Sequence, residues 1–137
     1  MLPIIARWSI AEGKRHEALK ALSALAKRVE LEEPFVAMYT IHTPDLSGPP
    51  IVSFPTPAAN EVIFLSVFDD YAAFEKHYTG LFKEWLDEHK QLFLLNNGNL
   101  FVVSEWLTRH AGFIRPQMVT PPHPASHAAG RLAEAAS

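Results

Sequence analysis

The sequence contains no cysteine, which excludes disulfides, thiolate nucleophiles and cysteine-ligated metal sites. It also lacks a basic excess: Lys and Arg number 12, Asp and Glu number 15, and the net charge of −3 argues against nucleic-acid or anionic-membrane partners. No stretch approaches the roughly 18 uninterrupted apolar residues of a membrane span. The first ten residues carry no basic region ahead of an apolar run, so we expect no secretion signal and a cytoplasmic protein.

The length of 137 residues fits one domain, and an apolar content of 48% is enough to bury a core. Proline divides the chain, because five of the eleven prolines lie at 44–60 and four at 116–124. Proline lacks a backbone donor, so neither segment forms a central strand or a helix interior. We therefore predict one domain over residues 1–114 with a long loop at 44–60. The Pro- and Ala-rich tail at 115–137 is expected to be disordered or packed on a partner subunit.

Hydrophobic periodicity predicts four strands and two helical regions. The strands are expected at 3–10, 35–42, 61–68 and 100–109, and the first helix over 12–29. Asp69 or Asp70 is expected to cap a second helix, which Gly80 interrupts and which resumes over 81–92. Residues 96–99 form a strong turn signal. The order β-α-β-β-α-β predicts a ferredoxin-like α+β protomer.

The predicted strands are apolar on both faces. In the third strand Val62, Phe64, Ser66 and Phe68 alternate with Ile63, Leu65 and Val67. In the second strand we expect one face to consist of Phe35, Ala37, Tyr39 and Ile41. Two helices cover only one face of such a sheet, and a solvated face would be polar. We therefore predict a homodimer in which two sheets pack together, with a folded-back loop or tail as the alternative cover.

Two segments resemble the antibiotic biosynthesis monooxygenase-like family of dimeric α+β barrel proteins. They are IIARWSIAEGKRHEAL at 4–19 and EVIFLSVFDDYAAFEKHYTGLFKEWL at 61–86, and the resemblance covers about residues 3–110. The resemblance implies a dimeric α+β barrel fold. It also implies activities that range from cofactor-independent oxygenation of aromatic phenols and quinols to haem degradation.

The sequence departs from the polar positions of both chemistries. Where cofactor-independent members carry Asn and Trp on the third strand, this chain has Phe64 and Phe68. Where haem-degrading members carry Asn, Trp and a ligating His, it has Ala6, His77 and Leu86. These departures argue against haem degradation and remove the usual hydrogen-bond donor of the oxygenases.

Aromatic residues gather on the expected helix-facing side of the sheet and on the second helical region. Bulky rings seldom fill a small sheet–helix sandwich completely, which favours a pocket for a small apolar or aromatic molecule. The expected lining residues are Phe64, Ser66, Phe68, Phe74, Phe82, Trp85 and Trp106. The alternative is that these rings only form an aromatic-rich core.

His77 and Tyr39 are the candidate catalytic residues. The neutral ring of His77 is suited to accept a proton from a phenol near neutral pH, and His42 is a second candidate. The hydroxyl of Tyr39 would orient the substrate. A structural histidine bonded to backbone is the alternative for His77, and His89 is similarly ambiguous.

No histidine pair combines i, i+4 spacing with a nearby carboxylate, so we predict no metal site. The resemblance to cofactor-independent oxygenases implies that no cofactor is bound. The charge of Arg7 needs a partner in its apolar strand, and Glu105 is the expected one. The leading hypothesis is a cofactor-independent monooxygenase acting on a phenol-, quinol- or polyketide-like substrate. The alternatives are a non-catalytic ligand-binding or stress-response module and a cofactor-free isomerase or cyclase.

Overall fold

The computed structural model describes residues 1–49, 51–52 and 57–115. The predicted tail lies outside these residues apart from residue 115. The elements follow the chain as β1 (Leu2–Ser9), α1 (Arg15–Glu32), β2 (Val36–His42), β3 (Glu61–Phe68), α2 (Tyr71–Thr79), α3 (Leu81–His89), a single 3-10 turn (Lys90–Leu92), β4 (Leu95–Asn96), β5 (Asn99–Leu100) and β6 (Val102–Trp106). The predicted ferredoxin-like α+β order is confirmed, with a small β4–β5 hairpin added before the last strand.

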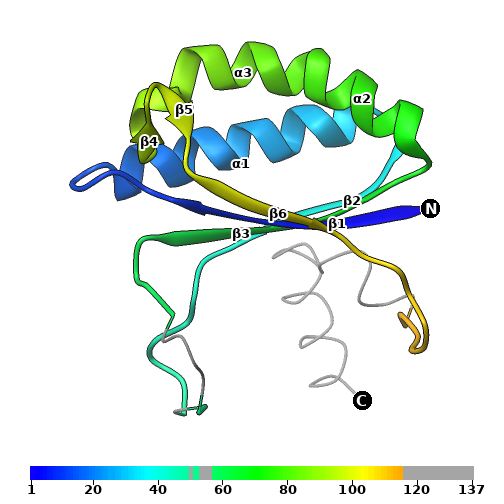
Figure 1. Cartoon of the computed structure of the whole chain (residues 1–137), viewed down its shortest axis with the longest axis horizontal. Coiled ribbons are helices and arrows are strands. Elements are labelled where there is room, and N and C mark those ends of the chain that lie inside the picture. Colours follow the sequence, from blue (N-terminus) through cyan, green and yellow to red (C-terminus); the bar gives the residue numbers. More distant parts are fainter. Residues whose placement is uncertain (50, 53–56, 116–137) are drawn as a thin grey trace, which may run out of the picture.

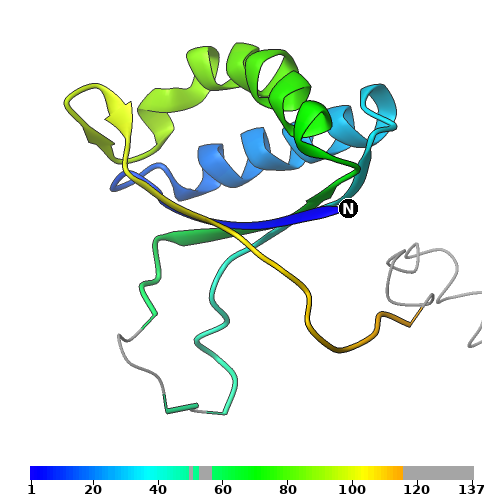
Figure 2. The ribbon, with the colours of Figure 1, turned by 45° about the vertical axis from the view of Figure 1, so that its right-hand side comes forward.

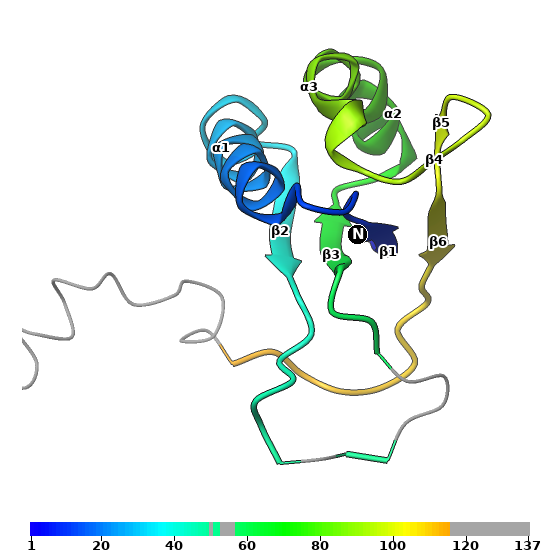
Figure 3. The ribbon, with the colours of Figure 1, turned by 90° about the vertical axis from the view of Figure 1, so that its left-hand side faces the viewer.

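The four long strands form one antiparallel sheet in the order β2-β3-β1-β6. The three α-helices of the described residues lie on one face of this sheet, so this part of the chain has two layers (Figure 1). Viewed along the strands, α1 lies above β2, whereas β6 forms the far edge beside the β4–β5 hairpin (Figure 3). Within the described ranges, no helix has the length and apolar character needed to cross a bilayer.

The first helix is held by an apolar stripe at helical spacing. Ala18, Leu22, Leu25 and Val29 are each at most 1% exposed, and they pack against the sheet and α3. The helix begins three residues later than predicted, because Gly13 adopts a φ of 74° in the preceding turn. It also runs three residues beyond Val29, to Glu32, so that the next residue, Glu33, becomes its C-terminal cap.

The second helical region is divided into α2 and α3 at Gly80, as predicted. Asp70 caps α2, since its carboxylate accepts a hydrogen bond of 2.8 Å from the backbone N–H of Ala73. At Gly80 a Cβ atom would lie only 2.7 Å from the carbonyl oxygen of Lys76. The close approach of the two backbones therefore requires glycine at this break.

The second strand contains a bulge that alters the predicted face of its first residues. Val36 pairs with Phe68 and Met38 with Val67, which leaves Ala37 without a partner. Val36 packs against the core and Ala37 is exposed, so the prediction that Ala37 shares a face with Tyr39 and Ile41 is wrong. Because the extra residue shifts the alternation, Tyr39 and Ile41 still face the core as expected.

The opposite face of the sheet carries Ile5, Ile63 and Leu65, all partly exposed, and the described helices leave it uncovered (Figure 1). Arg7 lies on this face and donates to Glu61 at 2.6 Å. The predicted partner Glu105 is wrong, since β1 and β6 pair so that Glu105 stands opposite Ile5. The described parts of the β2–β3 loop extend away on this side (Figure 2).

Candidate active site

A cavity of about 590 Å³ lies between the α2–α3 helices and the β1–β6 half of the sheet. It lies there because α1 packs on β2 and α2 on β3. The edge strand β6 contacts α2 through the ring of Trp106, which meets the rings of Tyr71 and Phe74. The β4–β5 hairpin lines one end, where Asn97 and Gly98 adopt φ values of 51° and 79°. Two such residues form a two-residue hairpin turn, which shortens β6 relative to the predicted strand.

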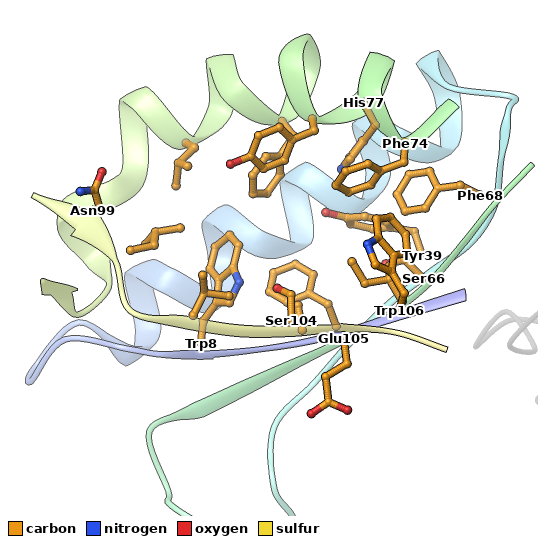
Figure 4. Close-up of a pocket in the computed structure, with 18 of the residues that line it drawn as sticks. Trp8, Tyr39, Ser66, Phe68, Phe74, His77, Asn99, Ser104, Glu105 and Trp106 are labelled. Atoms are coloured by element: carbon orange, nitrogen blue, oxygen red, sulfur yellow. The ribbon is translucent and has the colours of Figure 1, made fainter. Parts of the chain in front are cut away.

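Eight of the nine predicted site residues line this cavity (Figure 4); they are Tyr39, Phe64, Ser66, Phe68, Phe74, His77, Phe82 and Trp106. Trp85 does not. Its indole N–H donates to the carbonyl oxygen of Ala21 at 3.1 Å, and its ring is only 3% exposed. Trp85 therefore joins α3 to α1 within the core. The sequence pattern could not distinguish it from Phe82 on the same helix.

The floor of the cavity is set by strand register. Tyr39 pairs with Ser66, Ser66 with Ile4, and Ile4 with Trp106, so these four residues form one row across the sheet. The adjacent row adds Ala6 and Ser104, among others. Hydroxyl groups therefore alternate with apolar side chains on the floor, whereas Glu105 points away from the cavity (Figure 4).

The walls of the cavity are aromatic. Phe74 stacks on Tyr78 at a centroid distance of 5.6 Å, and Tyr78 stacks on Phe82 at 5.7 Å. Trp106 of the edge strand meets Phe74 edge-on at 4.7 Å. Trp8 of β1 is a further lining ring that the sequence reading did not single out. Flat rings of this kind favour a planar, aromatic guest.

His77 is 3% exposed and lies on the buried side of α2, where it lines the cavity. Its Nδ1 lies 2.5 Å from Oε2 of Glu33, which is itself 6% exposed. Burial lowers the pKa of His77 from its ordinary value, and the hydrogen bond and charge of Glu33 oppose this effect only in part. At neutral pH the ring is therefore neutral, and its Nδ1–H donates to the carboxylate.

The second ring nitrogen of His77 remains available. Within the described part of the chain Nε2 has no hydrogen-bond partner. No side-chain polar atom there is both fully buried and without a partner, so Nε2 keeps some exposure. Nε2 is therefore not sealed in the core. Since His77 lines the cavity, the lone pair on Nε2 is placed to accept a proton from a guest.

Tyr39 and Ser66 supply hydroxyl groups to the same cavity. The rings of Tyr39 and His77 meet edge-on at a centroid distance of 5.3 Å. Burial, and to a lesser extent the charge of Glu33, raises the pKa of Tyr39, so its hydroxyl stays protonated and can donate a hydrogen bond. Both residues line the cavity. The site therefore combines a proton acceptor with a hydroxyl donor.

Glu33 is another site residue that the sequence reading missed. A signal was present, because position 33 follows Val29 by four residues and so continues the buried stripe of α1. An acidic residue on a buried stripe needs a partner. That partner comes from a position 44 residues away, which no local pattern indicates.

The other candidate histidines lie elsewhere. His42 is exposed, and its Nε2 lies 3.1 Å from the hydroxyl of Thr40, away from the cavity residues. His42 therefore does not serve as the base of this site. His89 stacks on Trp85 and binds the carbonyl oxygen of that residue at 2.8 Å.

No family model and no curated protein matches this sequence. Solved structures do match. A Pseudomonas aeruginosa protein superposes with a TM-score of 0.61 at 20% identity, over 80% of this chain and 94% of its own. A structure named antibiotic biosynthesis monooxygenase gives a TM-score of 0.62 at 15% identity, over 81% and 100%. This chain has the antibiotic biosynthesis monooxygenase fold.

A variant of SnoaB from Streptomyces nogalater, named a cofactor-independent oxygenase, shares the same fold. It superposes with a TM-score of 0.57 at 11% identity, over 83% of this chain and 97% of its own. At these identities the likeness concerns the backbone alone. The predicted antibiotic biosynthesis monooxygenase-like fold is thus confirmed, whereas the chemistry has to be argued from the cavity residues.

Proposed function

We propose that this protein is a cofactor-independent monooxygenase acting on a small planar aromatic molecule with an ionisable hydroxyl, such as a phenol, quinol or polyketide-like ring. The observation that carries this proposal is the buried Glu33–His77 pair in the wall of an aromatic-lined cavity. The solved structures with this fold include proteins named as monooxygenases, which is consistent with the proposal.

The proposed reaction begins with proton transfer from the substrate to Nε2 of His77. An O–H bond breaks, an N–H bond forms, and the negative charge remains on the aromatic ring system. The electron-rich anion then transfers one electron to O₂, and the two radicals combine to form a C–O bond. The peroxide oxygen takes the proton back from His77. The hydroperoxide then loses the hydrogen of the attacked carbon together with its outer oxygen as water, which leaves a carbonyl, so one oxygen atom of O₂ enters the product and the other leaves as water. No external reductant is required.

The protein's part in this chemistry is to bind, orient and deprotonate. The stacked rings of Phe74, Tyr78 and Phe82 would hold the planar substrate by ring contacts. The hydroxyl of Tyr39 would donate a hydrogen bond to the developing oxyanion. The apolar walls would exclude water and so preserve the reactive anion.

Oxygen uptake tests this function directly. The purified protein would be supplied with a naphthohydroquinone and 1-naphthol, and O₂ consumption would be compared with the uncatalysed rate. His77→Ala should lower the rate by about 10²- to 10⁴-fold, the usual contribution of a general base. His42→Gln is the matched control, because His42 is exposed and does not line the cavity. Equal rates in the wild type and His77→Ala would remove His77 from the mechanism.

A cofactor-free isomerase or cyclase is the second candidate, because the same base and cavity suit proton transfer without oxygen. Exchange of substrate hydrogen for deuterium without oxygen uptake would identify it. A non-catalytic binding module would bind the aromatic probes without either reaction. Although Phe64 and Phe68 are buried, a cavity of about 590 Å³ remains beside them, which favours a bound guest in all three cases.

We further propose that the uncovered face of the sheet is covered by a second copy of this chain. Ile5, Ile63 and Leu65 on this face are partly exposed, and Val67 adjoins them. Exposed apolar patches of this kind are typical of interfaces, and an identical partner can supply a matching surface. Sedimentation that gives a single species of 15.3 kDa would overturn this assembly.

A further inference from the structure

The backbone around Glu33 holds its carboxylate in one place. Its N–H donates to the carbonyl oxygen of Val29, and its carbonyl accepts from the N–H of Val36, both at 3.0 Å. Pro34 follows directly and restricts the backbone of the turn. The carboxylate is thus carried on a short, doubly bonded junction between α1 and β2, which leaves it little freedom to leave His77.

The contact between Glu33 and His77 is buried, so each side chain has to satisfy the polar atoms of the other. The side chains of Glu33 and His77 are only 6% and 4% exposed, and they meet in a hydrogen bond of 2.5 Å between Oε2 and Nδ1. A carboxylate accepts hydrogen bonds but cannot donate them. The proton of a neutral His77 must therefore lie on Nδ1, and Nε2 must be bare.

We infer that Glu33 is a positioning residue, which fixes His77 in the tautomer whose unprotonated Nε2 faces the cavity and which stabilises the imidazolium formed when a proton is taken up there. This inference rests on the proposed function for its catalytic consequence. In the step concerned, the substrate O–H bond breaks and the Nε2–H bond forms, while the Nδ1–H bond stays intact and keeps donating to Glu33. The positive ring and the carboxylate then form a buried ion pair.

The neighbouring Glu32 offers a matched control. Its side chain is 51% exposed and pairs with Arg28 on the solvent side of α1, so it shares the charge and chain position of Glu33 without contacting His77. Glu33→Gln removes the charge and introduces an amide that can donate to Nδ1 as well as accept from it. Glu32→Gln makes the same chemical change on the surface.

Nitrogen-15 NMR of the histidine rings, with His77 assigned from the signal lost in His77→Asn, tests the tautomer without any ligand. The wild type and Glu32→Gln should show His77 protonated at Nδ1 alone, and Glu33→Gln should show a mixture of both tautomers. Protonation at Nε2 in the wild type, or an unchanged tautomer in Glu33→Gln, would overturn the inference. If Glu33→Gln does not fold, Glu33→Asp and the wild-type spectrum decide.

Oxygen uptake with 1-naphthol gives the second readout. Glu33→Gln should reduce kcat by about 10- to 100-fold with KM little changed, a smaller loss than removal of the base itself. Equal kcat in Glu33→Gln and Glu32→Gln would overturn the positioning role. Absence of uptake by the wild type would instead count against the proposed oxygenase function, and the NMR result would still decide whether Glu33 sets the tautomer.

Discussion

The buried His77 predicts that the protein loses stability as the pH falls through weakly acidic values. Burial lowers the pKa of His77 in the folded state, whereas in the unfolded chain the pKa returns to about 6.5. Below that value the unfolded state binds a proton that the folded state resists. The contribution of the neutral, buried His77 ring to the free energy of unfolding is therefore complete above about pH 6.5. It is lost as the pH falls toward the pKa of His77 in the folded state.

The magnitude is limited by one proton. Between the two pKa values the free energy of unfolding falls with a slope that approaches, at most, about 1.4 kcal/mol per pH unit. Tyr39 and Glu33 are the other titratable groups in contact with the His77 ring. Tyr39 stays protonated throughout this range because its pKa is raised, so it adds no slope.

Urea unfolding from pH 8 to pH 5, at fixed protein concentration, measures this slope in the wild type, His77→Gln and His16→Gln. His16 is exposed on α1 and serves as the control, so its variant should retain the wild-type slope. In His77→Gln the part of the slope due to His77 should disappear. A stability advantage of the wild type that grows as the pH falls would refute the reasoning. If His77→Gln is too unstable, direct NMR titration of His77 gives the same answer.

Three further predictions concern other parts of the molecule. Leu65→Lys, on the uncovered sheet face, should weaken self-association at least about a hundredfold by sedimentation, because each of the two copies loses about 1.5 kcal/mol or more of apolar burial. Ser23→Lys on the outer side of α1 is the control. Unchanged association of Leu65→Lys would exclude this face as the interface. Gly80→Ala should lower the free energy of unfolding in urea by about 1–3 kcal/mol, since the new Cβ would meet the Lys76 carbonyl oxygen at 2.7 Å. Gly48→Ala is the control and should be near neutral, so equal losses of stability in the two variants would contradict the clash. Tyr39→Phe should leave the absorbance change of tyrosine ionisation up to about pH 10 unaltered, because the pKa of Tyr39 is raised; a smaller change than in the wild type would show that Tyr39 ionises there.

Features that depend on neighbours in sequence were predictable. The third strand at 61–68 matches the prediction residue for residue, because a run of apolar and β-branched residues between flanking polar residues marks both of its ends. The Asp70 cap and the Gly80 break were likewise recognised, since each acts on backbone groups within four residues. Most of the cavity lining followed from strand alternation, which assigned Phe64, Ser66 and Phe68 to one face.

Features that depend on small backbone shifts were less predictable. The bulge at Ala37 changes which residues of β2 face the core, and nothing in the apolar run at 35–42 marks it. Trp85 and Phe82 share one helix face, yet only Phe82 reaches the cavity. The Arg7 partner depended on register between strands, which placed Glu61 rather than Glu105 within reach.

The sequence by itself determined the order of the elements, the faces of the third strand and the aromatic character of the site, because these follow from periodicity and from short-range capping. Only the tertiary structure decided that a cavity remains beneath α2 and that Glu33 meets His77 there. The reason is that the site brings together side chains 44 residues apart. Their contact depends on how α1, α2 and the sheet pack as three-dimensional bodies, and no local pattern encodes that packing.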